Sequence, residues 1–201
     1  MRLFFLTAAL LLGLTQTGWG QAMSFARVRE GGILRTSTGS AVVFNDYKGM
    51  GLNFQLNFGR AHATATERPT VFFVDDLMLQ LIAVRAAPYL KSTAEATLRA
   101  YITAEAAFQS QAMGIPLIPR IEAVQVTPSQ AGTWWGYAVP TETPGQTKQQ
   151  VFLTFMQGDF IMGLGSAQLN GENLSSSRAM LLRTARALQF SALPIAGAIK
   201  K

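Results

Sequence analysis

The sequence predicts an α+β fold, in which a mainly antiparallel β-sheet has helices packed on both faces. Two apolar runs, 149–157 and 160–169, flank Gly158-Asp159. This dipeptide favours a two-residue hairpin turn, because glycine supplies the positive φ that such turns need. Two segments with helical spacing of apolar residues, 93–113 and 174–190, accompany strand-like segments elsewhere. These observations predict a single α+β domain over residues 23–191.

The predicted hairpin is apolar on both faces. The turn pairs Leu153 with Leu164, and successive side chains then alternate between the two faces of each strand. One face carries Val151, Leu153, Phe155, Phe160, Met162 and Leu164. The other carries Phe152, Met156 and Ile161, together with Gly163, Gly165 and Ala167. Because both faces are apolar, we expect a covering layer on each side of a central hairpin.

The first 22 residues have the features of a signal peptide. Met1-Arg2 is a basic start, residues 3–14 are apolar, and Gly20 and Ala22 offer cleavage positions. The apolar run is shorter than the ~20 residues of a spanning helix, although an uncleaved membrane anchor is the alternative. The chain contains no cysteine, so no disulfide supports the domain. We therefore expect export to a bacterial periplasm through a cleaved signal peptide.

The N-terminal part of the domain is predicted to consist of strands. Residues 33–35 and 41–44 flank a polar turn and indicate a first hairpin. Residues 52–58 alternate strictly between apolar and polar side chains, which is typical of a half-buried strand. A polar connection, 59–69, follows and contains the only histidine, His62.

The segment 70–90 is ambiguous between one longer element and a strand followed by a helix. Residues 70–74 have the composition of a strand, and Asp75-Asp76 then precedes an apolar run. We favour a helix for that run, with the two aspartates as its cap and first-turn charges.

The helix 93–113 has a clear start signal. Ser92 and Glu95 have capping-box spacing, with Ser92 as the N-cap. The predicted apolar stripe consists of Ala94, Leu98, Tyr101, Phe108 and Ala112.

Two further strands and a second helix complete the domain. Residues 121–127 and 133–139 are predicted to form a strand pair. Asn173 is the predicted N-cap of helix 174–190. Its apolar stripe is formed by Leu174, Leu181, Ala185 and Leu188, so the helix should pack on the sheet. The last residues, 192–201, are predicted to be a loosely held tail.

The charge distribution argues against nucleic-acid binding. The formal net charge is +6, but the basic residues are scattered along the chain. Nucleic-acid binding requires a concentrated basic face. We expect a solvated basic surface, with at most weak contact to an anionic membrane surface.

The reactive residues also argue against an enzyme. His62 has no carboxylate or second histidine at ligand-like spacing. Asp75-Asp76 is the only adjacent acid pair, and no aspartate-rich loop supplies further oxygen ligands for a cation. No serine lies in a Gly-x-Ser-x-Gly turn. We therefore expect no catalytic residues, no metal and no cofactor.

Three residues are candidates for binding. Trp135 and Tyr137 share one face of the strand 133–139, and the alternation leaves open whether that face meets a partner or is covered by a helix. Glu105 projects with the apolar stripe of helix 93–113. Burial there raises the pKa of its carboxyl, whereas at the edge of the stripe its long side chain reaches solvent.

The hairpin and helix at 151–169 and 174–190 resemble the C-terminal part of the PsbP-like fold, a family of small exported proteins. The resemblance implies that the helix packs on the sheet after its last hairpin, and that the protein is a non-catalytic accessory or binding subunit. It contains no catalytic motif and transfers no functional residue.

We therefore predict an accessory or protein-interaction protein of the cell envelope, which docks an envelope protein around Trp135 and Tyr137. The alternative is a carrier of a small apolar ligand or lipid between helix 93–113 and the sheet. In that alternative Gly163 and Gly165 provide room, and Glu105 provides a polar contact.

Overall fold

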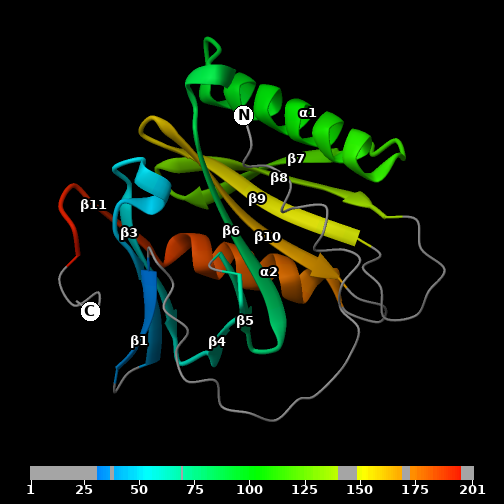
Figure 1. The fold of residues 1–201 in the computed structure, drawn as a ribbon. Coiled ribbons are helices and arrows are strands. Elements are labelled where there is room, and N and C mark those ends of the chain that lie inside the picture. Colours follow the sequence, from blue (N-terminus) through cyan, green and yellow to red (C-terminus); the bar gives the residue numbers. More distant parts are fainter. Residues whose placement is uncertain (1–30, 37–38, 69, 140–148, 169–172, 196–201) are drawn as a thin grey trace.

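The structure, a computed structural model, describes residues 31–36, 39–68, 70–139, 149–168 and 173–195. The predicted signal peptide and the last six residues lie outside these ranges. Within them the chain forms two antiparallel sheets and two α-helices, which confirms the α+β class (Figure 1). No helix among the described residues is long and apolar enough to cross a membrane.

The larger sheet has seven strands in the order β4-β5-β6-β10-β9-β8-β7. Its strands are β4 (Ala63–Ala65), β5 (Val71–Val74), β6 (Leu77–Arg85), β7 (Arg120–Thr127), β8 (Gln130–Ala138), β9 (Gln149–Gln157) and β10 (Phe160–Gln168). Two antiparallel meanders, β4-β5-β6 and β7-β8-β9-β10, meet where β10 pairs with β6. β4 lies within the segment that the sequence predicted to be a loop.

The predicted hairpin is confirmed, including its register. β9 and β10 flank the Gly158-Asp159 turn, where Gly158 has a φ of 54°. Leu153 pairs with Leu164 as expected. β10 lies between β6 and β9, so the hairpin occupies the middle of the large sheet.

The smaller sheet has four strands in the order β1-β2-β3-β11 and was not predicted as a separate sheet. Its strands are β1 (Gly31–Thr36), β2 (Gly39–Phe44), β3 (Asn53–Gly59) and β11 (Leu188–Ser191). The first three confirm the predicted N-terminal strands. β11 corrects the prediction, because helix 174–190 ends at Arg186 and the next residues pair with β3.

The segment after β5 also differs from the prediction. Asp75 and Asp76 do not cap a helix but form the turn of a hairpin, with φ values of 48° and 67°. Aspartate tolerates this left-handed conformation better than most residues. The apolar run that follows is the strand β6, which pairs with β5 on one side and β10 on the other. A short 3-10 helix, η3 (Ala87–Tyr89), then leads towards α1.

The first helix, α1 (Ala94–Met113), begins one residue later than its capping signal suggested. Thr93 is the N-cap, and its side chain accepts a hydrogen bond from the Ala96 amide. The helix ends at Met113 and is capped by Gly114, which has a φ of 68°. Its buried residues are Thr97, Leu98, Tyr101, Ile102, Ala106 and Gln109. The buried stripe is therefore rotated from the predicted one, because Ala94 and Ala112 are exposed.

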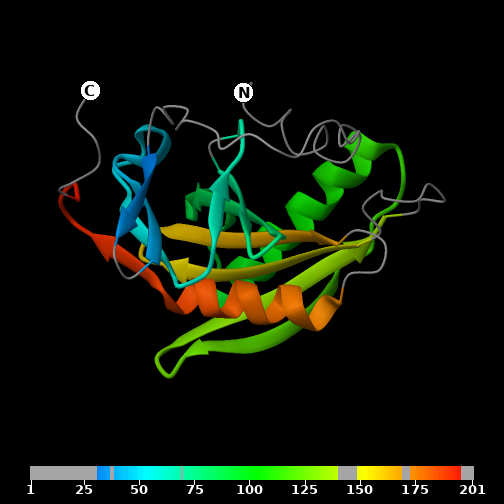
Figure 2. The same cartoon turned by 90° about the horizontal axis from the view of Figure 1, so that it is seen from below.

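The second helix, α2 (Leu174–Arg186), has the predicted N-cap. The Asn173 side chain accepts a hydrogen bond from the Ser175 amide at 2.9 Å. Figure 2 shows α2 running along the strands of the large sheet. Met180 and Leu181 are buried in the larger core cluster with residues of β9, β10 and the small sheet.

The central strands divide their side chains between two core clusters. Leu153 and Met162 belong to the cluster that contains α2 and the small sheet. Phe152 and Ile161, their neighbours in sequence, belong to the cluster that contains α1. This division follows from strand geometry, in which successive side chains point to opposite faces of the sheet.

Candidate functional site

Trp135 and Tyr137 are buried, contrary to a docking patch at the surface. Their exposed fractions are 2% and 3%. The Trp135 ring stacks on Phe152 with centroids 4.2 Å apart, and α1 covers both with Leu98 and Tyr101. We call this group, with Ile102 and Ile161, the aromatic cluster. A helix therefore covers the face that the sequence left open.

Glu105 is half-buried at the edge of the aromatic cluster. Its Oε1 accepts a hydrogen bond from Gln109 Nε2 at 2.8 Å. Burial raises the pKa of its carboxyl, and the hydrogen bond from Gln109 opposes that rise. Burial raises the pKa of Tyr101 and Tyr137, and the negative charge of Glu105 raises both pKa values further. The structure thus brings the three predicted residues together, around a core rather than a surface.

Of two buried polar atoms in the aromatic cluster, one has a hydrogen-bond partner among the described residues and the other has none. The Tyr137 hydroxyl donates a hydrogen bond of 2.6 Å to Gln150 Oε1. Trp135 Nε1 is buried and has no hydrogen-bond partner among the described residues. An unsatisfied buried donor costs stability.

The space expected at Gly163 and Gly165 is occupied. A Cβ on Gly165 would lie 2.8 Å from two ring carbons of Phe152, and one on Gly163 would lie 3.2 Å from Ile82. These glycines let Phe152 and Ile82 pack against the strand backbone. They leave no room for a ligand at these two positions.

The polar candidates weighed for catalysis lie elsewhere on the surface. Asp75 Oδ1 accepts a hydrogen bond from the backbone amide of His62 at 2.9 Å, and Asp75 Oδ2 lies 3.5 Å from Arg183. The imidazole Nδ1 of His62 lies 3.4 Å from the Thr64 hydroxyl. Among the described residues, no three acidic or histidine side chains are grouped as metal ligands. Asp75 thus ties the β5–β6 turn to β4 and to α2.

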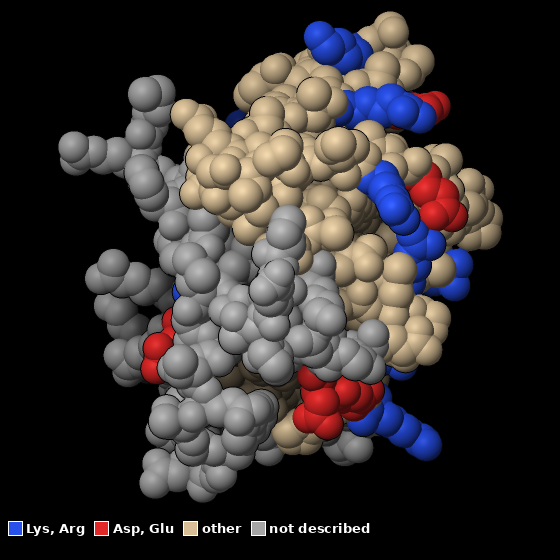
Figure 3. Space-filling model, turned by 90° about the vertical axis from the view of Figure 1, so that its right-hand side faces the viewer, with Lys and Arg blue, Asp and Glu red and all other residues tan. Residues whose placement is uncertain are grey.

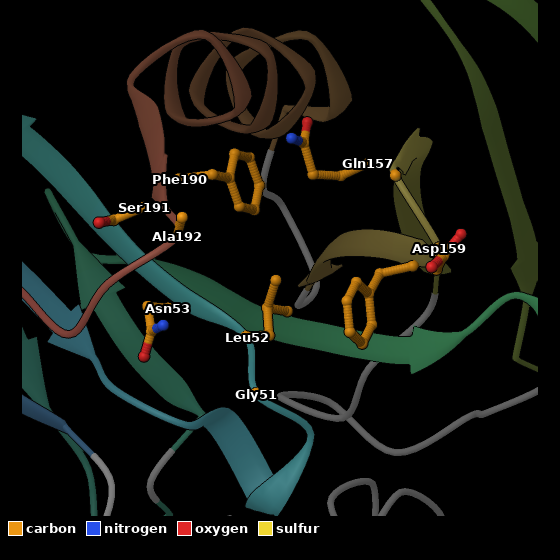
Figure 4. Close-up of a pocket in the computed structure, with 10 residues that line it drawn as sticks. Gly51, Leu52, Asn53, Gln157, Asp159, Phe190, Ser191 and Ala192 are labelled. Atoms are coloured by element: carbon orange, nitrogen blue, oxygen red, sulfur yellow. The ribbon is translucent and has the colours of Figure 1, made fainter.

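The structure places a hollow where the ends of both sheets meet. This inter-sheet groove has a volume of about 270 Å³. Its lining residues are Gly51, Leu52, Asn53, Gln157, Gly158, Asp159, Phe160, Phe190, Ser191 and Ala192 (Figure 4). They come from three segments: the start of β3, the β9–β10 turn, and the end of β11.

The groove combines an apolar base with a polar rim. Leu52 is buried, while Phe160 and Phe190 are half-buried against the larger core cluster. Asn53 is 6% exposed, and its Oδ1 accepts a hydrogen bond from the Asp46 amide at 2.9 Å. Asp159 is exposed at the turn and is the only charged residue among the described residues of the lining. The arrangement can receive an apolar group and a hydrogen-bonding or basic one.

The tail and a nearby arginine frame the groove. Asn45 exchanges two hydrogen bonds with the backbone of Ile195, at 2.7 and 3.2 Å. Arg85 donates to the Met50 carbonyl at 3.1 Å, and its guanidinium lies 5.4 Å from the centre of the Phe160 ring. These contacts fix the chain on both sides of the hollow.

Comparisons with known proteins give a likeness of fold. No protein-family model and no curated protein sequence matches the chain. Among solved structures, it is similar to the cyanobacterial PsbP, CyanoP, of Synechocystis sp. PCC 6803, with 11% sequence identity and a TM-score of 0.48. The match covers 79% of this chain and 98% of that chain. This similarity agrees, as a likeness of fold alone, with the PsbP-like resemblance of the hairpin and helix, and it assigns no functional residue.

Proposed function

We propose that the chain is a non-catalytic accessory protein, exported to the periplasm, which binds a protein of the cell envelope through the inter-sheet groove. The observation that carries the proposal is the groove itself, an open hollow with an apolar base and a polar rim. That composition is typical of the anchor pockets in protein interfaces.

The size of the groove favours one side chain of a partner over a whole ligand. Pockets for small molecules usually span about 300–1,000 Å³ and enclose most of the ligand. The groove, at about 270 Å³, lies below that range and is open. Burying one large apolar side chain there contributes roughly 1.5–3 kcal/mol. The carrier alternative loses support, because Phe152 and Ile82 occupy the space expected for its ligand.

The edge strand β11 is a further support. It pairs only with β3, so its other edge has no strand beside it among the described residues. An extended segment of a partner can add to such an edge while one of its side chains enters an adjacent pocket. Phe190 and Ser191 belong to both the edge strand and the groove lining.

We further propose that the large sheet is the middle layer of an α/β/α sandwich. Support comes from the core clusters, in which α1 contacts Phe152 and α2 contacts Leu153 of the same strand. In such an arrangement helices cover the faces of the sheet, so a partner can bind only at the ends and edges of the strands.

Basic and acidic side chains lie side by side on the face shown in Figure 3, which favours a partner recognised by shape over a polyanion.

The first test locates the partner. A photoreactive benzoylphenylalanine at Asp159 in the groove, and at exposed Glu95 on α1 as a control, is irradiated in the periplasm of the native host. We expect a specific protein adduct from position 159 alone. If the signal peptide is cleaved, the mass of the purified protein should correspond to a chain that begins at residue 21 or 23. A chain that keeps residues 1–22 contradicts the export part.

The second test blocks the groove. Ala192 lines the groove and is exposed, so Ala192→Trp fills the hollow without entering the core. Ala179→Trp, at an exposed position of α2, is the matched control. With the captured partner purified, we expect Ala192→Trp to weaken binding at least about tenfold, a loss typical of a central interface residue, and Ala179→Trp to leave it unchanged. Equal binding by both variants contradicts the proposed site.

A further inference from the structure

Among the described residues, no strand lies along the outer edge of β7, and this strand has a distinctive charge pattern. It is the last strand of the large sheet, and Figure 2 shows it as the outermost strand on its side. Arg120 and Glu122 are both exposed, and Ile118, just before the strand, is 82% exposed. Exposed edge strands offer unpaired backbone groups to another chain. The question is which chain fits this edge.

Only the first part of the edge is available for pairing. The register against β8 shifts between Gln125 and Thr127, and such a bulge bends the strand. Arg186 of α2 donates a hydrogen bond of 2.8 Å to the Val126 carbonyl and so covers that end. A second strand can therefore add along residues 120–124 and the residues that precede them.

We propose that β7 pairs with β7 of a second copy of this chain, antiparallel about a two-fold axis through Ile121. When the two-fold axis is normal to the sheet, the same face of both copies points to the same side of the joined sheet. The axis then passes midway between one residue and the same residue of the other copy. An axis at Glu122 would place two carboxylates opposite each other. An axis at Ile121 places Arg120 of each copy opposite Glu122 of the other.

This register provides partners of opposite charge for the charged side chains that are exposed along β7 in a single copy. Glu122 lies 3.1 Å from Arg178, but its side chain remains 60% exposed and can accept a second cation. Arg120 takes part in none of the ion pairs found among the described residues. The same register brings exposed Ile118 opposite half-buried Val124. Opposite charges and apolar pairs across strands are favourable, and like charges are not.

The register is tested by disulfide trapping, which the absence of native cysteine makes unambiguous. Directly opposite residues of an antiparallel pair have Cα atoms roughly 4.5–5.5 Å apart, within the reach of a disulfide. In Ile121→Cys the two thiols meet at the axis. In Ala123→Cys, the matched control, they lie four residues apart along the strand, about 13 Å. We expect oxidation to trap a dimer of the first variant and not of the second.

Charge reversal provides an independent test on the full chain by analytical ultracentrifugation. Arg120→Glu places acids opposite acids, and Glu122→Arg places arginines opposite arginines. We expect each variant alone to dimerise about tenfold more weakly than the wild type. An equimolar mixture should restore association, because every pair in the mixed dimer is again of opposite charge.

Three results would overturn this inference. The first is a wild-type monomer across the whole concentration series. The second is a dimer trapped by Ala123→Cys instead of Ile121→Cys, which fixes a different register. The third is a dimer that neither charge reversal weakens, which places the contact on another surface. None of them bears on the inter-sheet groove, so failure here is distinguishable from failure of the proposed function.

Discussion

The aromatic cluster and the inter-sheet groove are built from similar residues but differ in what fills them. In the aromatic cluster, Trp135 stacks on Phe152 at 4.2 Å and α1 covers both rings. In the groove, Phe160 and Phe190 leave a hollow of about 270 Å³ between them and the ends of the sheets. The cluster lies under a helix in mid-sheet, whereas the groove lies at a strand end and a turn.

A high density of aromatic residues in a sequence therefore does not by itself indicate a binding surface. Trp134-Trp135-Gly136-Tyr137 is the densest aromatic segment in the chain, and all four residues are buried. A mid-sheet position allows a helix to cover such rings, and burial is the larger gain. At the groove no element of the described residues covers all three segments, and the rings of Phe160 and Phe190 stay half-buried.

The largest expected effect comes from emptying the aromatic cluster. Trp135→Ala removes a ring that is 2% exposed, and we expect the free energy of unfolding to fall by about 3–5 kcal/mol. Urea denaturation followed by circular dichroism measures the loss. Trp135→Phe keeps a stacking ring and removes a donor without a partner, so its loss should be clearly smaller. A stable Trp135→Ala protein that no longer binds the proposed envelope partner would place the binding site at the aromatic cluster instead of the groove.

The next effect tests whether the glycine space is filled. Gly165→Ala places a Cβ 2.8 Å from the Phe152 ring, and we expect a cost of about 1–3 kcal/mol from overpacking. Gly158→Ala at the groove is the control, because no atom lies within 4 Å of its Cβ. Its cost comes from a φ of 54° alone and should be about 1 kcal/mol. A neutral Gly165→Ala would indicate a cavity beneath α1.

Most strands and helices could be predicted where a turn or capping signal, or a clear alternation of apolar and polar side chains, marked them. Gly158-Asp159 between two apolar runs predicted both the hairpin and its register. The prediction failed at Asp75-Asp76, because β6 is central in the sheet and a strand buried on both faces shows no period of two. It failed again at β11, because Leu188 fits a helical stripe as well as a strand. Pairing with β3, far earlier in the chain, decides between them.

The candidate site was less predictable than the fold. The grouping of Trp135, Tyr137 and Glu105 could be expected from alternation and helix spacing, but their burial depended on how α1 rotates about its axis. The groove draws Leu52, Asp159 and Phe190 from three distant segments, and none of these segments has a binding motif. Only the tertiary structure shows that they meet. The edge charges of β7 are visible in sequence, but that β7 is an edge strand is not.

A smaller effect concerns the acid at the edge of the aromatic cluster. Burial raises the pKa of Glu105 in the folded state, so its ionisation is less favourable there than in the unfolded chain. Its contribution to stability is fully present below the ordinary glutamate pKa and is lost as the pH rises through the raised value. We expect Glu105→Gln to be more stable than the wild type at neutral pH by less than about 1 kcal/mol. The difference should vanish in acid, as thermal melts across a pH series can show. A gain that persists in acid points to packing instead.

The smallest expected effect is at Asp159 of the groove, whose side chain is exposed. Asp159→Asn keeps the size and turn preference of the residue and removes the charge that Asp159 contributes to the groove lining. The backbone carbonyl of residue 159 still accepts the hydrogen bond from the Ala86 amide. We expect the free energy of unfolding to change by less than about 0.5 kcal/mol, as for other exposed positions. If the partner presents a basic group to the groove, its affinity should fall and become less dependent on salt. A large loss of stability would show that the groove, like the aromatic cluster, holds the fold together, and the contrast between the two regions would not stand.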